Sequence, residues 1–402
     1  MTRLAIDGGR PVRTLPFPPW PVFGPEEIDA AAGVLRSGRV NYWTGEECTA
    51  FEQEFAAMVG RRHAISLANG TVALELALIA LGIGSGDEVV VPSRTFIATA
   101  SCVVARGARP VVADVDPLSG NLLADTIATV LGPRTRAIIP VHLAGWPCEM
   151  DAILALAADR GIHVVEDCAQ SHGARYKGRM TGSFGDCAAF SFCQDKIMTT
   201  GGEGGMLVTD DEGLWRRAWE YKDHGKSWDA VNSGDHRPGF RWLHESFGSN
   251  FRMTEMQAAI GRRQLAKLPG WLEQRAANAT RLAQGMGNIR GLRIHLPEDH
   301  VLHAYYKFYA FLDPDVLKPG WDQTRIIDAI TAEGVPCLAG GCSEIYREKA
   351  FVAAGLTPAA PLPVASRMGS TSLMFLVHPT LSSSDMGDTL VAVEKVMSEA
   401  VA

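Results

Sequence analysis

Between about residues 60 and 210, short runs rich in β-branched residues alternate with longer segments of helical periodicity. Strands separated by helices of this length form βαβ units, in which parallel strands are covered by helices on both faces. Uninterrupted apolar runs, such as Val-Val-Val at 89–91, are typical of doubly covered strands. We predict strands at 63–67, 88–91, 110–113, 137–141 and 163–166, and helices at 71–81, 96–105, 123–131 and 150–159.

After residue 185 the pattern changes. Two strand-like runs, 187–192 and 205–208, are joined by a glycine-rich segment without a helix, so one strand is expected to run antiparallel to the others. The chain then continues with a helix at 212–224, further helices at 271–286, 323–333 and 385–398, and a strand at 307–312. We therefore predict an α/β protein with a large domain at 1–264, which includes an N-terminal arm, and a smaller α/β domain at 265–402.

Composition excludes several classes of partner. A net charge of −7 and a pI near 5.9 offer no basic surface for nucleic acid or anionic membranes. The start lacks the apolar core of a secretory signal, and no stretch approaches the ~20 apolar residues of a membrane helix. The eight cysteines are scattered and form no Cys-x-x-Cys pair, and the eleven histidines form no His-x-x-x-His pair. We expect a cytoplasmic protein without a metal site.

Three segments indicate a site for a phosphorylated pyridine aldehyde. The first is Ala-Asn-Gly-Thr at 68–71, which ends a strand and opens a helix. A helix N-terminus presents unpaired N–H groups that bind phosphate, and Gly70 and Thr71 suit that role. The alternative is an ordinary turn between strand and helix, closed by a helix cap.

The second segment is Val-Val-Glu-Asp at 164–167, where a strand ends in acids. Ligands of α/β folds bind at the carboxyl ends of parallel strands. An aspartate opposite a pyridine nitrogen keeps that nitrogen protonated, which makes the ring a better acceptor of carbanion electrons. The alternative is a helix-capping or solvated Asp167.

The third segment runs from an apolar strand through Cys-Gln-Asp-Lys at 193–196 to a glycine run at 201–205. Lys196 is suitably placed to form a Schiff base, because partial burial favours the neutral, nucleophilic amine. Taken alone, a lysine is more often a solvated surface charge.

Together these segments resemble the DegT/StrS family of sugar aminotransferases, which have the fold type I of pyridoxal-phosphate (PLP) enzymes. The resemblance runs from about residue 15 to the C-terminus. The motifs that carry it are Asn-Gly-Thr at 69–71, Pro-Ser-Arg-Thr-Phe at 92–96, Pro-Val-His-Leu-Ala-Gly at 140–145, Glu-Asp-Cys-Ala-Gln at 166–170, Gly-Ser-Phe-Gly-Asp at 182–186, the Lys196 segment, and Gly-Ser-Asn-Phe-Arg-Met at 248–253.

The resemblance implies a role for each matching residue. Lys196 forms the Schiff base with PLP and moves protons, and Asp167 pairs with the pyridine nitrogen. The other implied cofactor contacts are Gln170 near the ring hydroxyl, Phe96 stacked on the ring, Gly70, Thr71 and Ser191 at the phosphate, and Asn250 reaching the phosphate of a neighbouring subunit. A homodimer with shared active sites is therefore implied. L-Glutamate is the family's usual amino donor, and a keto or aldehyde sugar accepts the amino group in a ping-pong cycle.

Two features depart from the commoner family pattern. One is the Cys-Gln-Asp-Lys sequence, and the other is a long connection at 226–247 rich in aromatic and basic residues. We interpret that connection as a loop that covers the substrate or crosses to the partner, with a surface excursion as the alternative. Relatives that aminate position 8 of an eight-carbon keto-sugar acid, such as 8-oxo-Kdo, are similar in both places. Candidate substrate contacts are Arg94, His172, Trp242 and Arg252, although either Arg94 or Arg252 could equally form a structural ion pair.

Three alternatives were weighed against the aminotransferase. Some relatives are linked to regulation, and such a protein would bind cofactor without turnover. Other relatives dehydrate sugars and carry histidine in place of Lys196, so lysine favours transamination. A nicotinamide dehydrogenase needs Gly-x-Gly-x-x-Gly directly after a strand, whereas the glycines at 82–86 follow a predicted helix.

Overall fold

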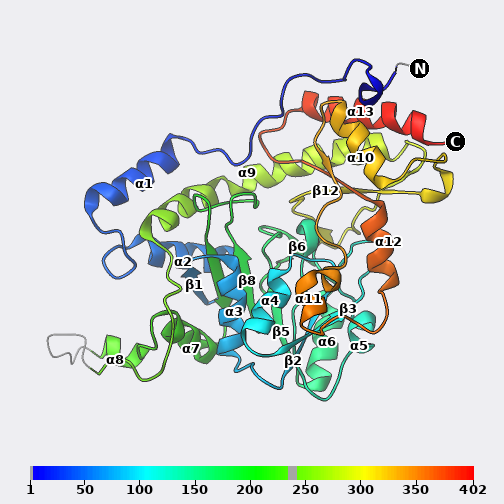
Figure 1. The fold of residues 1–402 in the computed structure, drawn as a ribbon. Helices are drawn as coiled ribbons and strands as arrows, with labels where there is room; N and C mark the ends of the chain where they lie inside the picture. Colours follow the sequence, from blue (N-terminus) through cyan, green and yellow to red (C-terminus); the bar gives the residue numbers. More distant parts are fainter. Residues whose placement is uncertain (1–2, 234–241) are drawn as a thin grey trace.

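A seven-stranded sheet forms the centre of the larger part of the molecule (Figure 1). In the computed structural model, which describes residues 3–233 and 242–402, the strand order is β1-β9-β8-β5-β4-β2-β3. The strands are β1 (His63–Leu67), β2 (Glu88–Pro92), β3 (Arg109–Ala113), β4 (Thr135–Ile138), β5 (His163–Asp167), β8 (Cys187–Ser191) and β9 (Gly205–Thr209). Pairing is parallel from β8 to β3, and β9 is antiparallel to both neighbours. The predicted mixed, mostly parallel α/β sheet is confirmed.

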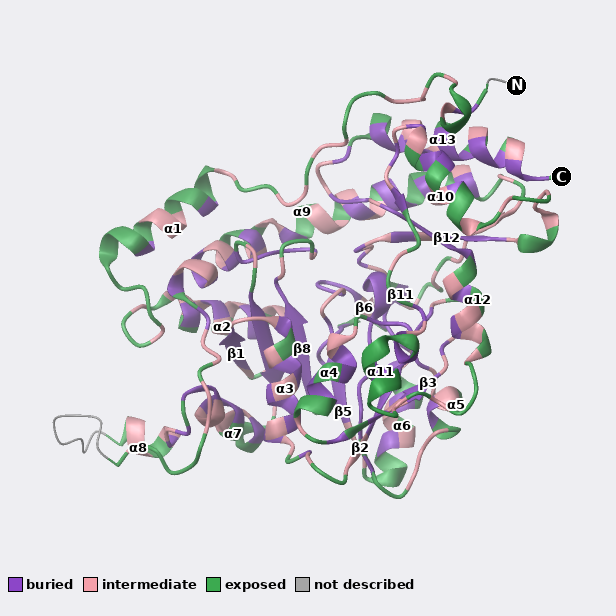
Figure 2. Ribbon diagram, in the orientation of Figure 1, coloured by how far each residue is buried: buried purple, intermediate pink, exposed green. Residues whose placement is uncertain are grey.

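Helices cover both faces of this sheet. They are α2 (Glu47–Val59), α3 (Gly70–Ala80), α4 (Ala98–Ala105), α5 (Ala124–Ala128), α6 (Met150–Arg160), α7 (Glu212–Lys222) and the long α9 (Glu255–Met286). Side chains alternate along a strand, so Ala189 and Leu207 pack with α3 and α4, while Phe190 and Met206 pack with α2 and α9. Figure 2 shows the strands buried between helices whose outer sides are exposed.

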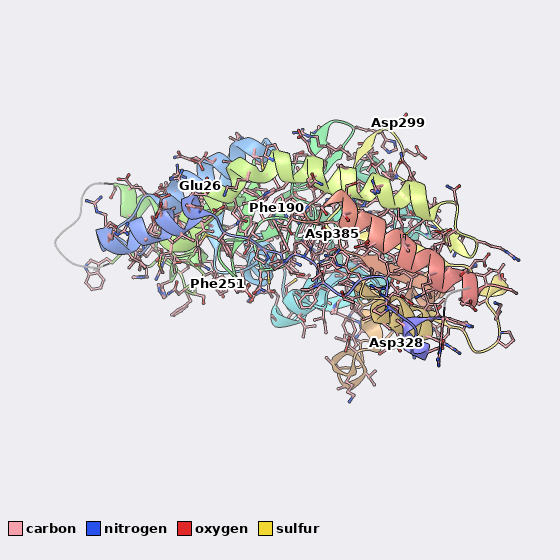
Figure 3. All side chains as sticks on the ribbon, turned by 90° about the horizontal axis from the view of Figure 1, so that it is seen from above. Glu26, Phe190, Phe251, Asp299, Asp328 and Asp385 are labelled. Carbon is pink, nitrogen blue, oxygen red and sulfur yellow. The ribbon has the colours of Figure 1, made fainter. Side chains whose placement is uncertain are left out.

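Helix α9 connects the two cores of the protein. Its N-terminus is held by a capping box: the Thr254 hydroxyl accepts the backbone N–H of Gln257, and the Gln257 side chain accepts the backbone N–H of Thr254. Seen from above in Figure 3, α9 crosses the molecule from α1 (Pro25–Ser37), where Glu26 is labelled, to α13 (Ser383–Ala400), which begins near Asp385. The sequence predicted only the second half of this helix, at 271–286, and placed the domain boundary between residues 264 and 265, which lies inside it. The division into two domains therefore stays a proposal.

The C-terminal core is a second α/β layer. Its sheet is antiparallel with the order β10-β12-β14-β13. The elements of this part are β10 (Leu292–Arg293), β12 (Phe308–Leu312), β13 (Cys337–Leu338), β14 (Ser372–Phe375), α10 (Gln323–Ala332), α12 (Pro363–Thr371) and α13. Helix α11 (Lys349–Ala353) packs through Phe351 against the core of the large sheet instead. Leu4 from the N-terminal arm is buried in the C-terminal core, and Val12 and Phe17 pack against it. The arm thus belongs by packing to the C-terminal part.

Short elements complete the described residues. They are the 3-10 helices η1 (Ala5–Asp7), η2 (Leu143–Gly145), η3 (Pro314–Val316) and η4 (Ile345–Arg347), helix α8 (Trp228–Asn232), and a small sheet of β6 (Arg175–Tyr176), β7 (Arg179–Met180) and β11 (Val301–Leu302). Helix α5 is shorter than predicted and ends before Gly132 and Pro133. Among the described residues, no helix combines the length and apolar character needed to cross a membrane.

The end of β5 is fixed by a buried carboxylate. Glu166 has no exposed surface and accepts backbone N–H groups of Gly182, Phe184 and Gly185 at 2.7 to 2.9 Å. It also contacts the His142 ring at 3.0 Å and the Arg61 guanidinium at 3.9 Å. Burial alone raises the pKa of a carboxyl, but these hydrogen bonds bring the pKa of Glu166 below its ordinary value. Glu166 therefore joins β5 to the turn at 182–185.

We predict that Glu166→Gln lowers the free energy of unfolding by about 3 kcal/mol, because an amide nitrogen cannot accept the Gly182 N–H. Urea denaturation measures the change. The control is Glu149→Gln, since the Glu149 carboxylate is 44% exposed and pairs with His300 at the surface; it should cost less than about 1 kcal/mol. Equal losses in the two variants would contradict the anchoring role of Glu166.

Candidate active site

A cavity of about 910 Å³ opens at the carboxyl ends of β5 and β8. Helices α3 and α4 and the start of β12 also contribute to its wall. The predicted cofactor residues that line it are Gly70, Thr71, Phe96, Asp167, Gln170, Ser191 and Lys196. Residues separated by more than 120 positions in the sequence therefore meet in one place, as the rule for parallel sheets anticipates.

Lys196 lies just beyond β8, on a segment held from several sides. Its backbone carbonyl accepts the indole N–H of Trp20 at 2.8 Å, and its amine lies 3.8 Å from an oxygen of Asp195. The hydroxyl of Tyr306 donates a short hydrogen bond to Asp195. Burial raises the pKa of Asp195, but Lys196 and Tyr306 outweigh this and bring it below its ordinary value. Lys196 thus faces the cavity beside an ionised carboxylate.

Asp167 is buried at the tip of β5, on the opposite side of the strand from Glu166. Its oxygens accept the Thr99 hydroxyl at 2.9 Å and the backbone N–H of Ala169 at 3.1 Å. Burial raises the pKa of Asp167. The two hydrogen bonds do not cancel this shift, and no cation lies within ion-pair distance of the carboxyl among the described residues. A protonated ring nitrogen would supply the missing positive charge, so the site fits a pyridinium.

The N-terminus of α3 faces the same cavity. Asn69 caps the helix by accepting the N–H of Val72 at 3.0 Å, which leaves the earlier N–H groups of Gly70 and Thr71 available to an anion. A Cβ on Gly70 would lie 2.6 Å from the Cβ of Ser191, so only glycine allows the serine so close. The arrangement has the donors that a phosphate requires.

Two further predicted residues frame the ring position. Gln170 accepts the backbone N–H of Ala144 at 2.7 Å through its side-chain oxygen, which leaves its amide nitrogen free to donate. Phe96 lines the cavity with 67% of its surface exposed, which is unusual for a phenylalanine. An exposed ring at the cavity wall suits stacking on a planar ligand.

Residues 21–394 match the DegT/DnrJ/EryC1/StrS aminotransferase family. The chain belongs to this family. It is therefore an enzyme, a PLP-dependent aminotransferase, and the predicted fold class is confirmed.

Relatives support this assignment over most of the chain. A spore coat polysaccharide biosynthesis protein, SpsC of Bacillus subtilis, is 35% identical and covers 94% of this chain and 96% of its own. A dTDP-3-amino-3,4,6-trideoxy-alpha-D-glucose transaminase of Streptomyces venezuelae is 40% identical, with 77% of this chain and 78% of its own covered. The crystal structure of an aminotransferase from Psychrobacter cryohalolentis is 53% identical and superposes with a TM-score of 0.94 over 96% of this chain and 100% of its own.

The candidate substrate residues take different positions. His172 has no exposed surface and packs between Phe190 and Phe192, which places it in the core. Its contact with substrate stays a prediction. Both of its ring nitrogens lack a hydrogen-bond partner in the described residues. Arg94 is also buried but lines a smaller hollow beside the main cavity.

Three residues predicted to contact ligands lie away from the cavity of their own chain. Arg252 donates to Asp223 at 2.8 Å, which is the structural ion pair weighed for it. Trp242 is 89% exposed, and Asn250 is also exposed. The contacts of Trp242 and Asn250 with ligands stay predictions. Within the connection at 226–247, the residues at 234–241, which include His236, Arg237 and Arg241, lie outside the described residues.

Several cavity residues were missed by the sequence analysis. They are Thr95, Thr99, Tyr306, Lys307 and Tyr309. The Thr99 hydroxyl donates to Asp167 and is bonded to the Thr95 hydroxyl at 2.9 Å. Its position one helical turn after Phe96 in the sequence could have indicated that it lines the cavity. No local signal marked residues 306–309, because their approach to Lys196 depends on the packing of the C-terminal core.

A buried His–Glu–Cys cluster lies behind the cavity. Ligand atoms of His142, Glu166 and Cys168 lie within 4.8 Å of one another. The His142 Nδ1 accepts the N–H of Cys148 at 2.9 Å, so the ring proton is on Nε2 and is donated to Glu166. Because both nitrogens are used, we ascribe the cluster to hydrogen bonding, and the absence of a metal site stays a prediction.

We predict that His172 makes the fold sensitive to acid. Burial, reinforced by Lys196 and Arg275, lowers its pKa from 6.5 to about 3. The unfolded chain therefore binds a proton between pH 6.5 and 3 that the folded chain does not, so stability falls as pH falls. In His172→Leu this loss should be smaller by roughly 3 kcal/mol at pH 4, as measured by urea denaturation across pH.

A matched control is Phe55→Leu. Phe55 packs against the same two rings, Phe190 and Phe192, and carries no titratable group, so its truncation should lower stability about equally at every pH. An unchanged pH dependence in His172→Leu would show that the ring is not the acid-sensitive group.

Proposed function

We propose that this enzyme transfers the amino group of L-glutamate to a keto or aldehyde sugar, using pyridoxal 5'-phosphate held at Lys196. The observation that carries the proposal is the meeting of three groups in one cavity: the Lys196 amine, the buried Asp167 carboxyl and the N-terminus of α3. Each group suits a different part of the cofactor: the amine its aldehyde, the carboxyl its ring nitrogen and the helix N-terminus its phosphate.

The residues fit the cofactor in the following way. Gly70, Thr71 and Ser191 would hold the phosphate, Asp167 the ring nitrogen, and Phe96 one face of the ring. Gln170 would donate its amide N–H to the ring hydroxyl. The contact of Asn250 with the phosphate of a partner subunit is part of the same proposal.

When bound, the cofactor supplies a carbonyl that carries the amino group between substrates and a ring that withdraws electrons. Asp167 keeps the ring nitrogen charged, and Thr99 holds the carboxylate in position. Lys196 would hold the cofactor through its amine and, once that amine is free, would serve as the group that carries a proton at the reacting carbon. Asp195, fixed by Tyr306, provides the negative charge beside this amine.

We propose a sugar as the acceptor because several relatives are named for amino-sugar or polysaccharide synthesis. The similar proteins include a dTDP-amino-sugar transaminase and a spore coat polysaccharide biosynthesis protein. We propose a nucleotide-linked keto-sugar or an eight-carbon keto-sugar acid such as 8-oxo-Kdo, in amino-sugar synthesis for cell-surface polysaccharide, including lipopolysaccharide.

We further propose a homodimer that works in the cytoplasm. Large side chains on the described surface, Phe96, Trp242 and Phe247, are 67%, 89% and 99% exposed, which is typical of surfaces that a partner covers. The eight cysteines are free thiols, which suits a reducing compartment.

We predict that Lys196→Ala abolishes both the yellow colour of the PLP-loaded enzyme and transamination, because the amine proposed to form the Schiff base is removed. Absorbance spectra and turnover with L-glutamate measure the two losses. Lys177→Ala is the control, since that lysine pairs with Asp151 on the surface and should leave both unchanged. A colourless wild-type protein after incubation with PLP would refute the proposed function.

Single-turnover chemistry should identify the acceptor. The enzyme is first converted to its aminated form with L-glutamate and then mixed with 3-keto and 4-keto nucleotide sugars and with free keto-sugar acids. We expect the aldehyde spectrum to return with one class of acceptor. Loading of PLP without reaction on any amino donor would favour the regulatory alternative, and elimination of water from the sugar would favour the dehydratase.

A further inference from the structure

A side pocket adjoins the main cavity beneath the C-terminal core. Its inner part, of about 30 Å³, shares Leu143, Lys307 and Tyr309 with the main cavity. Its outer part is a hollow of about 290 Å³ that shares His295 and Phe311 with the inner part. Four cationic side chains line this side pocket, Arg94, Arg293, Lys307 and Arg367, together with His295 and His303, whose pKa values burial lowers.

The side pocket is positive in a chain whose net charge is −7. None of the described residues that line it is acidic. The acids on the neighbouring loop are already engaged: Asp114 accepts backbone N–H groups at the start of α12, and Asp116 accepts the N–H and hydroxyl of Ser119. These carboxylates keep their charge, and Asp116 acts on His295, but none of the three arginines that line the pocket forms an ion pair among the described residues.

Arg94 is the most buried of these cations, with 1% of its surface exposed. It donates one hydrogen bond, to Ser343 at 3.2 Å, and lies 5.0 Å over the ring of Tyr309. Its Nε has no partner, and no carboxylate lies within ion-pair distance among the described residues. A buried guanidinium without a counter-charge is costly, and its planar donors match a carboxylate or phosphate.

Lys307 brings the positive charge next to the reacting amine. It lies at the start of β12, on the same side of the strand as Tyr309, whereas Phe308 points into the C-terminal core. Its amine is 4.7 Å from the ring centroid of Tyr306, and the amine of Lys196 is 5.1 Å from the same centroid. Burial lowers the pKa of Lys307 to about 8, and a bound anion would restore its charge.

A neutral donor completes the inner part. The Nδ1 of His303 accepts the backbone N–H of Tyr305 at 2.7 Å, which places the ring proton on Nε2. Tyr305 has a left-handed backbone with φ of 46°, and Arg275 donates to its carbonyl at 3.3 Å. Such strain is retained where a segment is held in position for function.

We propose that the side pocket binds a negatively charged group of the acceptor sugar, a carboxylate or a phosphate, and that Arg94 and Lys307 make the enzyme specific for anionic acceptors. This inference rests on the proposed function. An acceptor is favoured over L-glutamate because the pocket extends well beyond Arg94, into the outer hollow of about 290 Å³, and a five-carbon donor does not need that space.

The test compares binding of three probe sugars to the PLP-loaded enzyme by calorimetry: D-glucuronate, D-glucose 1-phosphate and D-glucose. We expect at least one anionic probe to bind 10- to 100-fold more tightly than glucose, roughly the effect of one or two charged hydrogen bonds. Arg94→Met and Lys307→Met should each remove most of this preference. Arg134→Met, which alters an exposed arginine paired with Glu88, should retain it.

Each outcome has a defined meaning. Preference for glucuronate assigns a carboxylate, and preference for glucose 1-phosphate assigns a phosphate. Equal binding of all three probes, or an unchanged preference in both pocket variants, overturns the proposal, as does a larger loss of affinity for L-glutamate than for the anionic sugar. If Arg94→Met does not fold, Lys307→Met still decides. A protein that fails to take up PLP would refute the proposed function instead, and the sugar comparison can still be made on it.

Discussion

The site depends on two consecutive acids at the end of one buried strand. Because side chains alternate along β5, Glu166 points to one side and holds the turn at 182–185, while Asp167 points into the cavity. The first carboxylate fixes the position at which the second can meet a charged ring. A change of one residue in strand register would exchange the two and abolish both roles.

Much of the large sheet could be predicted from local pattern. Apolar runs bounded by glycine and proline marked β1, β2, β3 and β5 because doubly covered strands have little polar content. The first half of α9 was missed because its buried positions are filled by Ala258, Ala259, Gly261 and Gln264, which do not form a strong apolar stripe. Its apolar periodicity becomes clear only later, near residue 271.

The cofactor residues were predictable, whereas the second wall of the cavity was not. Lys196, Asp167 and Gly70 each occur in a short motif whose chemistry can be recognised locally. Tyr306 and Lys307 lie in a run of aromatic residues whose sequence is typical of a hydrophobic core. They reach the cavity only because the C-terminal sheet packs close to Asp195. For His172 the sequence left a pocket residue and a structural histidine equally open, because burial depends on the packing of Phe190 and Phe192 around the ring.

The continuity of α9 limits how this enzyme can move. A single helix of 32 residues runs through both cores, and Pro269 in its interior has no N–H to donate to the preceding turn. A bend between the cores therefore has its most favourable position at this proline. Arg275, on the same helix, also holds the backbone at 305–306. Any relative movement of the two cores is therefore concentrated between Pro269 and the contact of Arg275 with residues 305–306, close to the wall of the cavity that carries Tyr306 and Lys307.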